Sequence, residues 1–227
     1  MIKFEKKNLF IYLLISAILS VALILSNLSV YAKQDKDVIL NNKIIYLDAG
    51  HGGKDNGASV DNILEDSINL SISNYLLEEL MRLGAYVLMS RTGDYDLASL
   101  YQKNRKREDL NNRVKYINKS NPDIFISIHL NIYSSSSVTG AQVFFQNNEN
   151  SKHLANVIQS KFNKLNKKDK KSKKGDYFIL NNSKPVGVLI ECGFLSNDAE
   201  RNKLTDSNYQ QKIANVISEG IVDYFML

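Results

Sequence analysis

Short apolar runs alternate with longer amphipathic stretches along most of the chain. Runs rich in β-branched residues predict strands at residues 43–47, 86–89, 124–128, 141–145 and 186–190. Apolar residues at helical spacing predict helices over residues 65–83, 97–119, 151–165 and 210–225. Because strands alternate with helices, we expect an α/β fold with a mostly parallel, mixed central sheet and helices on both of its faces, in a single domain.

The first part of the chain does not follow this pattern. Three lysines lie within the first seven residues, and an uncharged, mostly apolar run follows at residues 10–25. A basic start, an apolar run and small residues near position 32 are the layout of a secretory signal peptide. A membrane span needs roughly 20 apolar residues, and a looser count over residues 9–32 reaches that length, so an uncleaved N-terminal membrane anchor is the alternative.

These features divide the chain into three parts. We expect residues 1–32 to be a signal peptide or membrane anchor, residues 33–42 a short linker, and residues 43–227 the catalytic domain. In either case the body of the protein is exported and acts outside the cytoplasm. Contact with a membrane is expected only through the N-terminal segment, if it stays uncleaved.

Composition excludes several classes of protein. The single cysteine of the 227 residues, Cys192, excludes an internal disulfide framework and a four-cysteine metal site, and its apolar neighbours predict that it is buried. The excess of positive charge comes from residues 161–174, where eight lysines accompany one acid. We expect a solvated, mobile loop there, with attraction to an anionic polymer or membrane surface as the alternative. A nucleic-acid partner is not expected, because the protein is exported and only Phe162 is interleaved with the lysines.

Polar side chains follow three of the predicted strands. His51 comes just after the first strand, His129 ends the third, and Glu191 ends the fifth. Glu65 stands where the first predicted helix begins. In open parallel sheets ligands bind outside the carboxyl ends of the strands, so we expect these four residues to meet in one crevice. His153, beside a lysine near the start of an amphipathic helix, is expected at the surface.

Two histidines and one carboxylate form a common set of ligands for catalytic zinc, with a further position left for water. We therefore predict that His51, Glu65 and His129 hold the ion. Glu191 is the predicted general base, which later returns the proton as an acid. Iron or manganese is an alternative metal for the same ligands. The glycines around His51 could also suggest a phosphate-binding loop, but the loop lacks the Walker ending and the dinucleotide spacing.

Five segments carry a resemblance to a known family. In chain order they read LDAGHGG, LEDSINL, SRTGDYD, FISIHLN and VLIECGFLSN. This set resembles the zinc-dependent N-acetylmuramoyl-L-alanine amidases of the amidase-3 type, over about residues 43–225. The resemblance implies hydrolysis of the amide between the lactyl group of N-acetylmuramic acid and L-alanine in peptidoglycan. It also implies that zinc is bound by His51, Glu65 and His129, that Glu191 is catalytic, and that Arg91 and Arg113 match arginines of the family.

The finer resemblance is to the germination-specific amidases of spore-forming bacteria. Ala49 departs from the proline common in the first motif, and no separate wall-binding repeat is expected. The resemblance implies sporulation, with spore-cortex maturation through muramic-δ-lactam formation, in the cell envelope or spore intermembrane space. It also implies a possible activating protein partner. The alternatives are another zinc hydrolase, either a peptidase or a sugar deacetylase, and a catalytically silent wall-binding module.

Overall fold

The computed structural model describes residues 15–25 and 38–226. Residues 15–25 form a helix in a unit separate from the compact unit that begins at Leu40. Within the described ranges, no helix has the length and apolar character needed to cross a membrane. The choice between signal peptide and anchor rests mainly on residues 1–14 and 26–37, which lie outside the described residues, so it stays a prediction.

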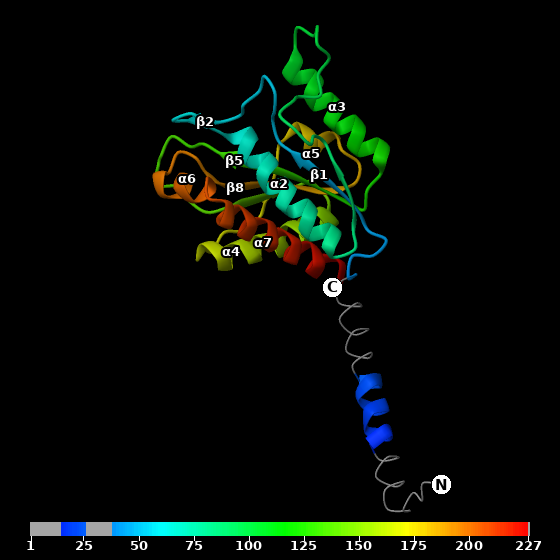
Figure 1. Ribbon diagram of the computed structural model, residues 1–227. Coiled ribbons are helices and arrows are strands. Elements are labelled where there is room, and N and C mark those ends of the chain that lie inside the picture. The colour runs from blue at the N-terminus through cyan, green and yellow to red at the C-terminus, as the bar shows by residue number, and fades with distance from the viewer. Residues whose placement is uncertain (1–14, 26–37, 227) are drawn as a thin grey trace, which may run out of the picture. The chain divides into compact units, whose positions relative to one another are not determined.

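One six-stranded sheet organises the compact unit. Its strand order is β4-β1-β5-β8-β6-β7 (Figure 1). The strands are β1 (Ile44–Ala49), β4 (Tyr86–Met89), β5 (Ile124–Asn131), β6 (Gln142–Phe145), β7 (Lys173–Lys174) and β8 (Val186–Phe194). The first four strands in the spatial order are parallel, and β6 runs antiparallel to β8. The prediction of a mostly parallel, mixed sheet is confirmed.

Helices cover both faces of this sheet. One face packs against α2 (Glu65–Arg82), α4 (Glu149–Asn166) and α7 (Ser207–Met226), and the other against α3 (Arg105–Ser120) and α5 (Phe178–Asn182) (Figure 1). Side chains along β1 alternate between the two faces. Ile45 and Leu47 pack in the core beneath α2, α4 and α7, and Tyr46 packs in the smaller core beneath α3 and α5. The short helix α6 (Asp198–Leu204) follows β8, and a hairpin of β2 (Ser59–Val60) and β3 (Ile63–Leu64) precedes α2.

The predicted helix over residues 97–119 is wrong in its first part. The helix begins only at Arg105, where the Asn104 side chain accepts a hydrogen bond from the backbone N–H of Arg107. Residues 97–104 instead form a loop that lies against α3, where the backbone N–H of Leu97 donates a hydrogen bond to the Asp109 side chain. Leu97, Ala98 and Leu100 are compatible with a helix, but the Asn104 cap sets the true start.

The lysine-rich stretch is also more regular than expected. Lys161 and Lys164 lie on α4, and Lys161 pairs with Asp223 of α7 at 2.7 Å. At the other end, Lys173 and Lys174 form the edge strand β7. The expectation of a loop is therefore wrong at both ends of the stretch.

Candidate metal centre and active site

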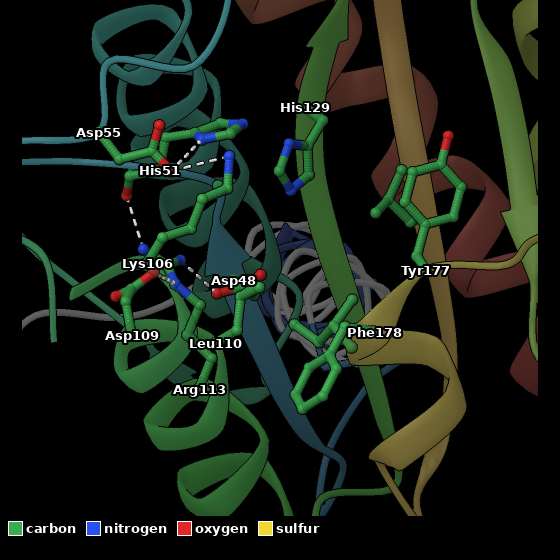
Figure 2. Close-up of a pocket in the computed structure, with 13 residues that line it drawn as sticks. Asp48, His51, Asp55, Lys106, Asp109, Leu110, Arg113, His129, Tyr177 and Phe178 are labelled. Atoms are coloured by element: carbon green, nitrogen blue, oxygen red, sulfur yellow. Dashed lines mark hydrogen bonds and ion pairs between the residues drawn. The ribbon is translucent and has the colours of Figure 1, made fainter. Parts of the chain in front are cut away.

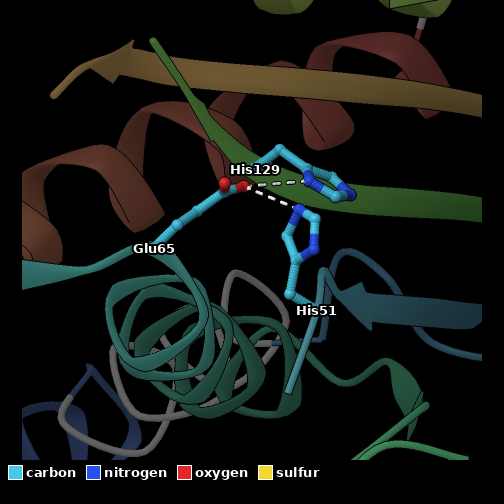
Figure 3. A group of neighbouring side chains, drawn as sticks. All are labelled: His51, Glu65 and His129. Atoms are coloured by element: carbon cyan, nitrogen blue, oxygen red, sulfur yellow. Dashed lines mark hydrogen bonds and ion pairs between the residues drawn. The ribbon is translucent and has the colours of Figure 1, made fainter. Parts of the chain in front are cut away.

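His51, Glu65 and His129 come from three different segments and meet at the carboxyl end of the sheet. His51 follows β1, His129 lies on the neighbouring strand β5, and Glu65 is the first residue of α2. Their ligand atoms all lie within 4.8 Å of one another (Figure 3). Glu65 Oε1 is 3.3 Å from His51 Nε2 and 3.0 Å from His129 Nδ1. The predicted convergence is thus present, and such separations suit donors that share one ion through bonds of about 2.0–2.2 Å.

Hydrogen bonds hold these three side chains together. Burial disfavours a charged Glu65, but hydrogen bonds with His129 and His51 outweigh burial and hold its pKa well below the usual range. Burial likewise opposes charge on His51, yet hydrogen bonds with Glu65 and Asp55 raise the pKa of its imidazole to about 9. A divalent cation can therefore take the place of the imidazole protons that lie against the Glu65 carboxylate.

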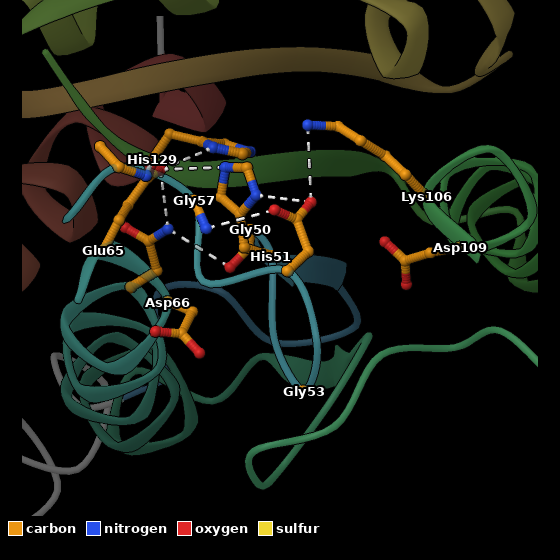
Figure 4. A network of polar contacts seen from close by, with 12 residues as sticks. Gly50, His51, Gly53, Gly57, Glu65, Asp66, Lys106, Asp109 and His129 are labelled. Atoms are coloured by element: carbon orange, nitrogen blue, oxygen red, sulfur yellow. Dashed lines mark hydrogen bonds and ion pairs between the residues drawn. The ribbon is translucent and has the colours of Figure 1, made fainter. Parts of the chain in front are cut away.

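Asp55 fixes the orientation of the His51 ring. Its Oδ2 lies 3.0 Å from His51 Nδ1, on the opposite side of the ring from Glu65, and 3.7 Å from Lys106 Nζ (Figure 4). A carboxylate that receives the distal N–H of a metal-binding histidine sets its tautomer and makes it a stronger ligand. Sequence reasoning missed Asp55; its signal is an acid four residues after His51 in the same glycine-rich loop.

Two glycines leave room for the ligands. A Cβ at Gly50 would overlap the imidazole of His129, so that ring can lie over the loop only because Gly50 has no side chain. Gly57 has φ +67°, and a Cβ there would stand 2.5 Å from Glu65 Oε2. Sequence reasoning noted the glycines around His51 but not Gly57.

Two buried arginines hold the loop that carries His51. Arg91 donates to the carbonyls of Ala49 and Gly50, at 3.0 Å each. Arg113 donates to the carbonyls of Ala49 at 2.7 Å and His51 at 2.6 Å. The arginines that the resemblance singled out therefore position the backbone beside the ligands, which also allows His51 to keep a left-handed φ of +60°.

Glu191 lies next to this group on β8. Its register partner across the parallel pair is His129, so the two side chains share one face of the sheet. Its carboxyl is buried; Oε1 accepts a hydrogen bond from the Tyr177 hydroxyl at 3.4 Å, and Oε2 has no partner among the described residues. Burial raises the pKa of Glu191 more than nearby His129 lowers it. A buried acceptor without a partner next to a metal-ligand set is typical of a proton-transfer group.

Known proteins resemble this chain in both sequence and fold. Residues 45–223 match the family described as N-acetylmuramoyl-L-alanine amidase. The chain belongs to this family. The germination-specific N-acetylmuramoyl-L-alanine amidase of Bacillus subtilis is 43% identical over 194 residues, covering 82% of this chain and 81% of the relative.

Further relatives support the same assignment. The amidase LytC of Bacillus subtilis is 31% identical, covering 86% of this chain and 38% of that protein. Among solved structures, the CwlD amidase of Clostridioides difficile in complex with the GerS lipoprotein has a TM-score of 0.79 at 38% identity, covering 82% of this chain and 99% of that one. The amidase described here is therefore a peptidoglycan hydrolase, as the sequence motifs indicated.

A cavity opens beside the ligands of the amidase. It measures about 150 Å³ and lies between α3 and α5, next to His51 and His129 (Figure 2). Lys106 reaches over it from α3, and Phe178 from α5 closes the opposite side. Apolar side chains line the cavity together with Lys106, Arg113 and three aspartates, and a portion of the substrate can lie there beside the ligand set.

The remaining predictions for single residues are confirmed. Cys192 is buried in the larger core, and His153 is exposed on α4, where its ring lies against Tyr224 of α7 at 5.6 Å between centroids. Sequence reasoning missed Tyr177, which stands immediately before α5 and has no motif around it.

Proposed function

We propose that the amidase hydrolyses the amide between the lactyl group of N-acetylmuramic acid and L-alanine, with zinc held by His51, Glu65 and His129. The observation that carries this proposal is the meeting of two imidazoles and a carboxylate, with ligand atoms within 4.8 Å, beside the buried Glu191. Three protein ligands with space for water are the arrangement of catalytic rather than structural zinc.

In this reaction each residue has a separate task. Zinc at the site supplies Lewis acidity that makes water nucleophilic near neutral pH. Glu191 accepts a proton from the attacking water while the water oxygen bonds to the lactyl carbonyl carbon. When the carbon–nitrogen bond breaks, Glu191 returns that proton to the amine of L-alanine. The products are a muramic carboxylate and a stem peptide with a free N-terminal alanine.

Tyr177 and Asp55 support these tasks without touching the bond that breaks. The Tyr177 hydroxyl holds one oxygen of Glu191, which leaves the second oxygen available for the proton. Asp55 keeps Nδ1 of His51 occupied, so that Nε2 faces Glu65 and the ion.

Mass spectrometry of muropeptides incubated with the purified protein and zinc tests this proposal. We expect free peptide beginning with alanine, and a fall in kcat of roughly 10²–10⁴-fold for Glu191→Gln with zinc content unchanged. Glu149→Gln, at an exposed acid on α4, is the matched control and should be fully active. His129→Ala should lose zinc as well as activity.

Other products would point to the alternatives. Release of acetate would indicate a sugar deacetylase, and cleavage within the stem peptide would indicate a peptidase. If Glu191→Gln retained the full biological effect, the protein would be a wall-binding module and the proposed mechanism would be wrong.

We further infer that the amidase acts outside the cytoplasm in spore-cortex maturation, needed for germination, where it removes stem peptides on the way to muramic-δ-lactam. Support comes from the germination-specific relative and from the CwlD structure. Cells without the gene should form cortex that lacks the lactam, and only the wild-type gene, not the Glu191→Gln gene, should restore it. Lactam at normal levels in the deletion strain would contradict this role.

A protein partner is part of the proposal, because the CwlD amidase was solved with a lipoprotein bound. We propose that a lipoprotein of the same kind activates this amidase. The rate of peptide release should rise when the lipoprotein is added to the purified, zinc-loaded protein. A full rate without any partner would exclude this requirement.

A further inference from the structure

A second groove lies at the same end of the sheet, toward its β7 edge. It has a volume of about 480 Å³ and is lined by Lys170, Lys171 and Lys173 together with three aromatic residues, Tyr133, Phe144 and Phe194. No acidic residue lines it. We call this depression the lysine groove.

Strand register places the lysine groove on the same face of the sheet as the active site. Leu189, two residues before Glu191 on β8, pairs with Phe144 of β6, and Phe144 pairs with Lys173 of β7. Paired residues share a face, and so do residues two apart on one strand. The side chains of Glu191, Phe144 and Lys173 therefore leave the sheet on one side.

Tyr177 connects the groove to the catalytic carboxyl. Its ring contacts Phe144 edge to face, with 5.1 Å between centroids, and its hydroxyl donates to Glu191 at 3.4 Å. A substrate whose reacting bond lies at Glu191 can thus extend across Tyr177 into the lysine groove. The cavity beneath Lys106 lies on the other side, between α3 and α5.

The positive charges of the groove are available to a ligand. Lys170 is held in place, because its Nζ donates to the carbonyl of Gly140 and stands 5.1 Å from the centre of the Phe194 ring. Lys171 and Lys173 are exposed, and neither forms an ion pair with an acid in residues 38–226. Two unpaired ammonium groups beside aromatic walls suit a flexible chain that carries carboxylates.

We propose that the lysine groove binds the stem peptide of the substrate through its free carboxylates, and that Lys171 and Lys173 select anionic stems. This inference rests on the proposed function, since it assumes that the scissile amide lies at Glu191. A concave site that continues from the catalytic carboxyl fits a short peptide, whereas a membrane surface requires an open, convex patch.

The test compares two double variants with the same net charge. Lys171→Gln with Lys173→Gln removes both free cations of the groove. Lys164→Gln with Lys174→Gln is the matched control, because both lysines are exposed in the same stretch and neither lines the groove. Lys171→Gln alone, outside β7, serves if the first double variant folds poorly. Calorimetry measures the Kd for a released stem peptide with free carboxylates and for its fully amidated analogue.

We expect the groove double variant to bind the anionic peptide roughly three- to tenfold more weakly and to raise KM for the matching muropeptide by a similar factor. Its kcat should stay within about twofold of wild type. The control should match wild type, and the amidated peptide should bind all proteins equally. Equal losses in both double variants, or an equal loss with the amidated peptide, would overturn the proposal.

This experiment separates the groove from the proposed function. If wild type binds the anionic peptide through Lys171 and Lys173 but releases no alanine-terminated peptide from muropeptides, the proposed hydrolysis fails and the groove remains. If hydrolysis proceeds and binding is insensitive to both lysines, only the groove proposal fails.

Discussion

Arg113→Met removes a charge that the structure holds deep beneath the active-site loop. The guanidinium is 2% exposed and lies 2.7 Å from both Asp48 and Asp109. It also donates to the carbonyls of Ala49 and His51. Methionine has a similar length and can fill the space, so the change isolates the loss of charge and hydrogen bonds from the loss of volume.

The expected cost follows from what remains after the substitution. Asp48 keeps its hydrogen bond from the Ser127 hydroxyl at 2.7 Å but loses its cation, while two loop carbonyls lose donors. Breaking a buried ion pair by removing one partner costs about 3–5 kcal/mol of unfolding free energy. For a chain of this size each kcal/mol lowers Tm by about 2–4 °C, which gives a fall of roughly 6–20 °C.

The loss should depend on pH in a defined direction. Burial alone would raise the pKa of Asp48, but Arg113 and the Ser127 hydroxyl hold it below its usual range. In wild type Asp48 therefore contributes stability above its unfolded pKa of about 3.9, which is lost as pH falls through the folded pKa. In Arg113→Met burial dominates, so the pKa of Asp48 rises and the buried carboxylate destabilises the variant at neutral pH. The difference between the two proteins should shrink as pH falls from 7 toward 4.

Urea unfolding of both proteins between pH 4 and pH 7, with chelator present, measures this difference. The metal ligands titrate in both proteins, so their contribution cancels in the comparison. Lys115→Met, a substitution at a neighbouring position of α3, is the control for the helix itself. A difference below about 1 kcal/mol at pH 7, or one that does not change with pH, would refute the reasoning.

Three further predictions concern residues around the proposed metal site. Asp55→Asn should weaken zinc binding about 10–100-fold, because the His51 ring loses its carboxylate partner. Competition with a chromophoric chelator measures the affinity. An unchanged affinity would mean that Asp55 pairs with Lys106 but does not support His51 as a ligand. Gly50→Ala should destabilise the protein by about 1–3 kcal/mol in thermal unfolding and lower zinc occupancy, because the new Cβ displaces the His129 ring. Glu191→Gln should make the metal-free protein more stable by about 1 kcal/mol at pH 7. Because burial raises the pKa of Glu191, this advantage should vanish as pH falls through the unfolded pKa near 4.3, and an advantage that persists at pH 3 would contradict it.

The sequence predicted that His51, Glu65, His129 and Glu191 lie close together, because each stands at or near the end of an apolar run or at the start of a helix. The strands continue past their apolar runs, to Asn131 in β5 and Phe194 in β8, so the predicted strand ends were too early. His129 and Glu191 are nevertheless neighbours, because the carboxyl-terminal parts of parallel strands lie side by side. Glu65 followed from the start of a strongly periodic helix. Local pattern and one topological rule were sufficient for these positions.

Other parts of the site depend on contacts between distant segments, which a local pattern does not record. Asp55 reaches His51 only because the loop takes left-handed backbone angles at several residues, and Tyr177 precedes a helix of five residues, too short to show periodicity. The loop over residues 97–104 resembled helix in composition, but its backbone bonds to the Asp109 and Asn112 side chains of α3 instead.

Hydrogen bonds within the protein hold the loop that carries His51. His51 holds a left-handed conformation, which costs about 1–3 kcal/mol for a residue other than glycine and persists only when its surroundings determine it. Arg91 and Arg113 hold this conformation, because they donate hydrogen bonds to the carbonyls of Ala49 and His51 on either side of Gly50. These hydrogen bonds within the protein therefore set the position of His51 in the proposed metal site. A loop held in this way suits the proposed hydrolysis, because the ligands of a catalytic metal must keep their places while substrate reaches the remaining coordination position.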